Sequence, residues 1–219
     1  MNDSALKNTY LQTVIYAVST LLLGLSVVFL PLNEIECGLV RDLQDFARRT
    51  SMLQALWVLT YLGDFYLWVV STTIFSIYAY KSGKQHRLVT ELAIFLGTTT
   101  ALTFVLKMVF ARPRPLCLGI TVYDFEGSFS YPSGHVSRVT GAFNILTKKN
   151  NKWKTVAVAA TASVSLSRIV LGAHYLTDVV GGVLISLAAQ GMSNLALSHI
   201  CEDRARKTQP EDPRAEKRD

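Results

Sequence analysis

Long apolar runs separated by short polar stretches fill most of this 219-residue chain. A helix that crosses a bilayer needs roughly 20 consecutive apolar residues. Six runs reach or approach that length, at residues 10–32, 55–79, 88–110, 134–147, 155–174 and 175–198, although the fourth is short and would need length from its flanks. Only 17% of the residues are charged, against about 25% in ordinary soluble domains. We therefore predict an all-α fold: a polytopic membrane protein built as a bundle of six transmembrane helices.

The segments outside the six runs complete this layout. The run from Tyr10 to Leu32 is too long for a signal-peptide core and is followed by no small-x-small cleavage site, so we expect it to remain as the first helix. Residues 33–51 alternate apolar and charged side chains at helical spacing, which predicts an amphipathic helix at the membrane surface; an exposed loop helix fits equally well. We divide the chain into a membrane domain, 1–200, and a charged, disordered cytoplasmic tail, 201–219.

The distribution of lysine and arginine predicts the orientation of the bundle. With six spans, the N-terminus, the stretches near 80–88 and 147–154, and the tail share one side, which holds fourteen of the 22 Lys and Arg residues. Cytoplasmic loops are the ones enriched in Lys and Arg. We therefore expect a multi-pass protein of the plasma (inner) membrane with both termini in the cytoplasm. Because the basic residues are spread over loops and a tail, they do not indicate nucleic-acid binding.

Three polar clusters stand at or near the ends of apolar runs, and the predicted topology puts all three on the extracytoplasmic side. Ionisable side chains at a membrane boundary are costly unless they are paired or used. The clusters supply one lysine, two arginines, two histidines and a carboxylate, which suit the binding of a phosphate and an attack on it. They are Lys107 to Arg114-Pro115, then Pro132-Ser133-Gly134-His135, then Ser167-Arg168 with His174 and Asp178.

Each cluster has a chemical interpretation and a structural one. His174 and Asp178, four residues apart, would share one face of a helix, so the carboxylate could fix the imidazole tautomer and leave the other nitrogen free to attack; a purely structural His-Asp pair is the alternative. Arg168 lies six residues before His174, and its planar fork suits phosphate oxygens.

The other two clusters would hold the anion. Ser133 is a favoured N-cap and Gly134 permits close approach of the backbone, so free N–H groups at a helix start would face a phosphate. His135 would then stand in the first turn, placed to donate a proton. Lys107 and Arg114 could converge on the same phosphate, or Lys107 could simply reach for lipid headgroups as an interfacial anchor.

Taken together, the three motifs closely resemble the signature of the type 2 phosphatidic acid phosphatase superfamily. That signature is Lys-x6-Arg-Pro, Pro-Ser-Gly-His and Ser-Arg-x5-His-x3-Asp, and every position is matched here, in order. The resemblance is to the integral-membrane lipid phosphatase branch, including enzymes of undecaprenyl-diphosphate phosphatase and phosphatidylglycerophosphatase B type. The soluble haloperoxidases of the superfamily are a poorer match because this chain is not soluble.

The resemblance implies a role for each matched residue. His174 would be the nucleophile that forms a phosphohistidine, Asp178 would orient it, and His135 would protonate the leaving oxygen. The phosphate would be held by Lys107, Arg114, Ser133, Gly134 and Arg168. No metal or other cofactor is expected. Beyond the signature, we hypothesise that Arg138, one helical turn after His135, contacts a second phosphate or an acidic headgroup; a pair with Asp124 or Glu126 is the alternative.

The expected function is therefore hydrolysis of a phosphate or diphosphate lipid headgroup at the extracytoplasmic face, with polyprenyl diphosphate favoured as substrate. Phosphatidylglycerophosphate or phosphatidate phosphatase activity is a close alternative, since the motifs recognise the phosphate and not the lipid tail. A lipid phosphotransferase could use the same histidine, and a non-catalytic membrane binding protein is a further alternative. The expected partners are the lipid substrate and the bilayer, with no nucleic acid.

The chain has three cysteines, Cys37, Cys117 and Cys201, with no Cys-x-x-Cys motif. Cys37 and Cys117 could share a compartment and pair. Unpaired thiols in an apolar environment are the simpler expectation.

Overall fold

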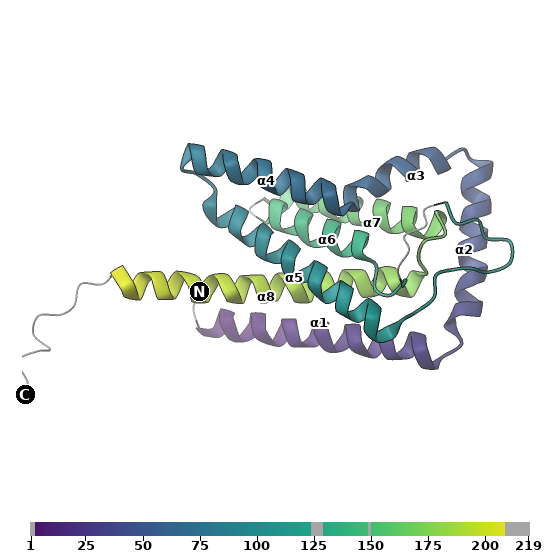
Figure 1. Cartoon of the computed structure of the whole chain (residues 1–219), viewed down its shortest axis with the longest axis horizontal. Helices are drawn as coiled ribbons and strands as arrows, with labels where there is room; N and C mark the ends of the chain where they lie inside the picture. The colour runs from purple at the N-terminus through teal and green to yellow at the C-terminus, as the bar shows by residue number, and fades with distance from the viewer. Residues whose placement is uncertain (1–2, 124–128, 149, 209–219) are drawn as a thin grey trace, which may run out of the picture.

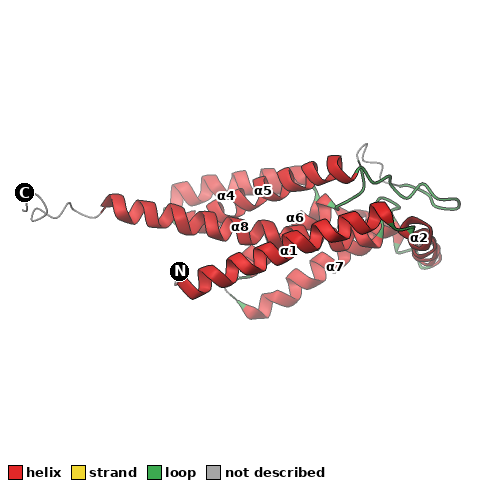
Figure 2. Cartoon of the chain, turned by 90° about the horizontal axis from the view of Figure 1, so that it is seen from below, coloured by secondary structure: helices red, strands yellow, loops and turns green. Residues whose placement is uncertain are grey.

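A computed structural model describes residues 3–123, 129–148 and 150–208, and within these ranges every regular element is a helix (Figures 1 and 2). The predicted all-α class is therefore confirmed. The elements are α1 Asp3–Phe29, α2 Leu32–Arg49, α3 Leu53–Thr60, η1 Tyr61–Gly63, α4 Phe65–Ser82, α5 His86–Phe110, α6 Gly134–Thr147, η2 Asn151–Trp153, α7 Lys154–Val170 and α8 Leu176–Thr208.

The outward faces of the long helices are apolar. Large hydrophobic side chains such as Leu22 in α1, Ile74 in α4 and Phe104 in α5 are each more than 60% exposed. An outer surface of this kind is unusual for a water-soluble protein but matches lipid. Within the part of the chain that the structure describes, three helices are long and apolar enough to cross a membrane: Ser4–Phe29, His86–Phe110 and Leu176–Glu202.

The second predicted run, 55–79, is a bent pair of helices. The segments Leu53–Gly63 and Phe65–Ser82 meet at 49°, and together they would make a fourth span. The bend follows from Asp64, whose extended backbone and side chain begin a new helix: its carboxylate accepts a hydrogen bond from the backbone N–H of Leu67 at 3.0 Å. The break matters for the site because it places Gly63 against His135.

The runs at 134–147 and 155–174 form helices of 14 and 17 residues, which are shorter than the roughly 20 residues that a membrane-spanning helix needs. The 14 residues of α6 rise about 21 Å, less than the roughly 30 Å of a hydrocarbon core. Most of α6 is buried, and α6 packs against α5, α7 and α8. A count of six spanning helices therefore stays a prediction.

Helix α2 runs across one end of the bundle, transverse to the long helices (Figure 1). The predicted helix at 33–51 is present, and its inward face carries Glu36, Cys37, Val40, Gln44 and Ala47. The placement of this helix at a membrane surface stays a prediction. Its position over the end of the bundle puts it beside the N-terminus of α8.

The start of α1 and the end of α8 lie at the opposite end of the bundle from α2 (Figure 1). At that distant end the Lys148 ammonium binds Glu91 at 2.8 Å and Asn194 at 3.1 Å, tying α5 and α8 to the turn that follows α6. Helix α8 continues to Thr208, past the boundary that we predicted at residue 200, and 209–219 lie outside the described residues.

Candidate active site

The three predicted clusters meet at the end of the bundle covered by α2. The backbone N–H of Ser133 donates to the carbonyl of Asp178 at 2.9 Å, which joins the second cluster to the third. The guanidinium of Arg114 donates to the carbonyl of Ala173 at 2.8 Å, which joins the first cluster to the third. Residues far apart in the sequence thus form one buried polar site.

His174 and Asp178 form the predicted pair, with Nδ1 of the imidazole 3.5 Å from Oδ2 of the carboxylate and both side chains completely buried. The expected shared helical face is wrong in detail, because α8 begins only at Leu176. Helix α7 ends at Val170, Gly172 turns the chain at a φ of +70°, and the N–H of His174 returns to the carbonyl of Arg168 at 3.2 Å. The turn, not a helix, therefore aims the imidazole at Asp178.

The start of α6 is the stretch of backbone that we predict to bind an anion. Ser133 occupies the N-cap position with extended geometry, and its hydroxyl makes no capping bond. That hydroxyl is buried and has no hydrogen-bond partner among the described residues. A buried polar atom without a partner needs an explanation, and the phosphate oxygen that we predict at this helix N-terminus would supply one.

His135 follows in the first turn of α6 and is 8% exposed. It packs closely against Gly63: a methyl group at Gly63 would lie 2.7 Å from the carbonyl oxygen of His135 and 2.8 Å from its Cβ. The bend between α3 and α4 therefore sets the position of His135.

The three predicted phosphate-binding cations are anchored by backbone or hydroxyl oxygens. Arg168 is fully buried and donates to the hydroxyl of Thr60 at 3.0 Å, while Arg114 is 5% exposed. The Lys107 ammonium binds the carbonyl of Phe129, which ties it to the segment leading into the second cluster. Near this segment, burial raises the pKa of Tyr131 well above its usual value, so its hydroxyl stays protonated and donates to the carbonyl of Thr20.

Sequence reasoning missed two charged residues at the site, Arg112 and Glu36. Arg112 contacts Asp178 and Glu36 at 2.6 Å each and is almost completely buried. Glu36 could have been suspected, because it shares a helical face with Cys37, Val40 and Gln44. A carboxylate on the buried face of an amphipathic helix needs a cation or hydrogen-bond donors to compensate it.

Arg138 lies beside the site, where its Nε donates to the carbonyl of Gly63 at 2.9 Å and its guanidinium stands 5.8 Å from the ring centroid of Phe65. One of its terminal nitrogens would be 3.1 Å from a methyl group at Gly134. The alternative partners Asp124 and Glu126 lie outside the described residues.

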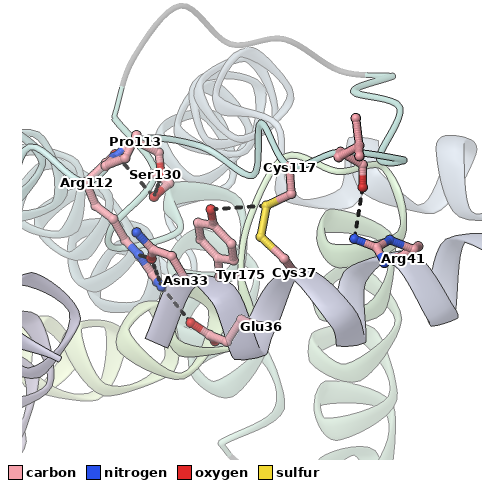
Figure 3. The surroundings of a disulfide bond; sticks show 10 residues. Asn33, Glu36, Cys37, Arg41, Arg112, Pro113, Cys117, Ser130 and Tyr175 are labelled. Carbon is pink, nitrogen blue, oxygen red and sulfur yellow. Dashed lines mark hydrogen bonds and ion pairs between the residues drawn. A yellow bond between two sulfur atoms is a disulfide. The ribbon is translucent and has the colours of Figure 1, made fainter. Parts of the chain in front are cut away.

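Cys37 and Cys117 form a disulfide, so the expectation of unpaired thiols was wrong for these two residues (Figure 3). The physical reason is the position of α2, which brings the two Cα atoms to 6.1 Å, a normal separation for a disulfide. The bond joins α2 to the segment between α5 and α6, next to Tyr175 and Arg112 (Figure 3). Cys201 is free and exposed.

A model of the PAP2 superfamily matches residues 88–196, a stretch that contains every position of the three clusters. The chain belongs to the PAP2 superfamily. Two curated proteins also match: phosphatidylglycerophosphatase B of Bacillus subtilis, 30% identical over 105 residues, and undecaprenyl-diphosphatase of Sulfolobus acidocaldarius, 30% identical over 128 residues. The matches cover 43% and 56% of this PAP2 chain, and 50% and 60% of the relatives' own lengths.

Solved structures show the same PAP2 fold over most of the chain. One is a transmembrane PAP2-type phosphatidylglycerolphosphate phosphatase from Bacillus subtilis, with a TM-score of 0.69, 21% identity, and coverage of 92% of this chain and 99% of that one. Another is LpxE of Aquifex aeolicus, with a TM-score of 0.59 and 24% identity. That match covers 72% of this chain and 93% of the LpxE chain.

Proposed function

We propose that this chain is a membrane lipid phosphatase that removes phosphate from a phosphate or diphosphate lipid headgroup at the extracytoplasmic face. The observation that carries the proposal is the meeting of the buried His174–Asp178 pair with the open N-terminus of α6 in one site. A nucleophile held by a carboxylate, next to a helix start that can bind an anion, suits phosphoryl transfer.

In the proposed reaction, Nε2 of His174 attacks the phosphorus while the bond from phosphorus to the leaving oxygen breaks. Asp178 holds Nδ1, and His135 gives a proton to the leaving oxygen. Lys107, Arg114, Arg168, the Ser133 hydroxyl and the Gly134 amide would stabilise the transferring group. Water then attacks the phosphohistidine, releasing inorganic phosphate and restoring His174.

An apolar cavity of about 670 Å³ between α4 and α5 supports a lipid substrate. Phe65, which lies below the guanidinium of Arg138, lines it, and so does Phe104, one turn before Lys107. The rest of the lining is apolar or small, including Leu96, Gly97 and Ala101. A cavity with this lining suits a hydrocarbon tail whose headgroup reaches the polar site.

Polyprenyl diphosphate is our favoured substrate, converted to the polyprenyl monophosphate. The match to a relative named undecaprenyl-diphosphatase supports it, and the position of Arg138 beside Gly134 is consistent with contact to a second phosphate. The match to a relative named phosphatidylglycerophosphatase B favours the second candidate, hydrolysis of phosphatidylglycerophosphate. Arg138→Ala separates the two: if Arg138 contacts a second phosphate, turnover of diphosphate lipid should fall about tenfold or more while turnover of monophosphate lipids changes little. Equal losses on both would contradict this role.

The test of the function is phosphate release by the purified protein in detergent. Polyprenyl diphosphate, phosphatidylglycerophosphate and phosphatidate would be compared, with and without EDTA, beside His174→Ala. We expect release that survives EDTA and disappears in the variant. Metal independence is part of the prediction, so loss of activity with EDTA would contradict it. Release that requires an added acceptor would instead identify a phosphotransferase, and no release by folded protein would favour a binding role.

A further inference from the structure

The guanidinium of Arg112 is enclosed by groups from three parts of the chain. A guanidinium has five N–H donors, and all five are used here. Nε and one N–H of Nη2 reach Oδ1 of Asn33 at 3.1 and 2.8 Å, and the other N–H of Nη2 reaches Oε2 of Glu36 at 2.6 Å. Nη1 donates to the hydroxyl of Thr177 and to Oδ1 of Asp178, both at 2.6 Å.

These bonds exclude Arg112 from the set of residues that bind phosphate. The ring of Tyr175 also covers the guanidinium, with the central carbon 4.1 Å from the ring centroid. With its donors used and one face covered, Arg112 has nothing to offer the substrate. Its effect on the reaction must pass through Asp178.

Glu36 reaches the same place from α2 and satisfies the start of α8. Its Oε1 accepts the backbone N–H of Thr177 at 2.7 Å, and its Oε2 accepts the hydroxyl of the same residue at 2.8 Å. Asp178 accepts the N–H of Tyr175 at 2.9 Å with Oδ2. The exposed donors of a helix N-terminus are normally satisfied by nearby side chains. Here one of the two carboxylates comes from another helix.

This arrangement also sets the charge beside His174. Two carboxylates, Glu36 and Asp178, share the single guanidinium of Arg112, and all three side chains are at least nine-tenths buried. The charge next to the imidazole is therefore that of the Asp178 carboxylate, whose Oδ2 lies 3.5 Å from Nδ1 of His174. Such a charge stabilises the positive charge that the imidazole gains when its other nitrogen bonds to phosphorus.

We infer that Arg112 and Glu36 are positioning residues that hold Asp178, and through it His174, in the reactive geometry, with the Cys37–Cys117 disulfide fastening Glu36 in place. This inference rests on the proposed function. Glu36 precedes Cys37 in the sequence, and Cys117 lies five residues after Arg112, so the disulfide and the ion pair join the same two segments (Figure 3). Helix α2 thereby becomes part of the catalytic apparatus without touching the substrate.

The first variant is Glu36→Gln, with Glu34→Gln on the exposed side of α2 as the matched control. We expect Glu36→Gln to lower kcat about 10- to 100-fold, the range for a catalytic group displaced by up to an ångström. Its KM and the inhibition constant of inorganic phosphate should stay within about twofold of the wild type, because Lys107, Arg114 and Arg168 are held by oxygens of Phe129, Ala173 and Thr60. Glu34→Gln should leave kcat, KM and the inhibition constant of inorganic phosphate unchanged.

A second measurement separates positioning from a general loss of structure. If Glu36 acts through Asp178, then adding Glu36→Gln to Asp178→Asn should lower kcat by less than about threefold. Fully additive losses, or a raised KM with unchanged kcat, would overturn the inference. If Glu36→Gln unfolds, Arg112→Lys applies the same test, since it keeps the charge but loses the five-donor fork.

The outcomes also separate this inference from the proposed function. A wild-type protein that releases no phosphate from any lipid would remove the proposed function, and the inference with it. If the wild-type protein hydrolyses lipid phosphate and both Glu36→Gln and Arg112→Lys keep full kcat, the inference is overturned while the proposed function stands.

Discussion

Nδ1 of His174 lies 3.5 Å from Oδ2 of Asp178, and the same oxygen accepts the backbone N–H of Tyr175 at 2.9 Å. The backbone bond keeps the carboxylate directed at the turn that carries the histidine. The other oxygen of Asp178 is held by Arg112. Both oxygens of the carboxylate are therefore fixed by the protein before any substrate arrives.

The variant Asp178→Asn tests whether the carboxylate of Asp178 holds His174 in its reactive form. An amide of the same shape cannot hold the imidazole in the reactive tautomer, so we expect kcat to fall about 10²- to 10⁴-fold. Glu36 still neutralises Arg112 in this variant, so the destabilisation should be about 1–3 kcal/mol and not the 3–5 kcal/mol typical of a broken buried ion pair. Phosphate release in detergent measures the change in kcat, and thermal unfolding in detergent measures the change in stability. Full activity would show that Asp178 does not act on His174.

Gly63→Ala tests whether the bend between α3 and α4 positions His135. The added methyl would stand 2.7 Å from the carbonyl oxygen of His135, closer than any normal contact, and backbone must move to relieve it. We expect lower kcat and a loss of about 1–3 kcal/mol of stability. Gly38→Ala in α2 is the matched control, because a methyl there meets nothing within 4 Å and should stabilise the helix by up to about 1 kcal/mol. Equal behaviour of the two variants would contradict the role of Gly63.

The disulfide gives a third prediction. It spans 80 residues of sequence, so its loss should lower stability by about 2–4 kcal/mol and let α2 move relative to Arg112. A reductant should lower both the melting temperature and the kcat of the wild type. In a Cys37→Ser/Cys117→Ser double variant the same reductant should change nothing, while Cys201→Ser should behave as the wild type does. A wild type that is indifferent to reductant would show that the bond has no part in holding the site.

The helical class could be predicted from sequence, and so could the grouping of the motif histidines and arginines in one site. Both predictions rest on short motifs and apolar periodicity, which are local patterns. Glu36 and Arg112 could not, since they are 76 residues apart and meet only because α2 folds across the end of the bundle. The disulfide was missed for the same reason: spacing along the chain says nothing about which cysteines the crossing of α2 brings together. The break at Asp64 was hidden within an apolar run, where a single N-cap residue outweighed the hydrophobic pattern.

Filling the cavity between α4 and α5 tests the binding of the lipid tail. Gly97 lines this cavity, and a side chain there would meet nothing within 4 Å of its Cβ, so Gly97→Leu occupies space without disturbing the fold. We expect this variant to raise KM for a long-chain polyprenyl diphosphate about tenfold, the effect of roughly 1.4 kcal/mol of lost apolar contact. A water-soluble short-chain isoprenyl diphosphate should be hydrolysed as before, because the polar site is untouched. Val109→Leu, on the exposed face of the same helix, adds bulk away from the cavity and should leave both substrates unaffected. If Gly97→Leu slows the short and long substrates equally, the tail binds elsewhere.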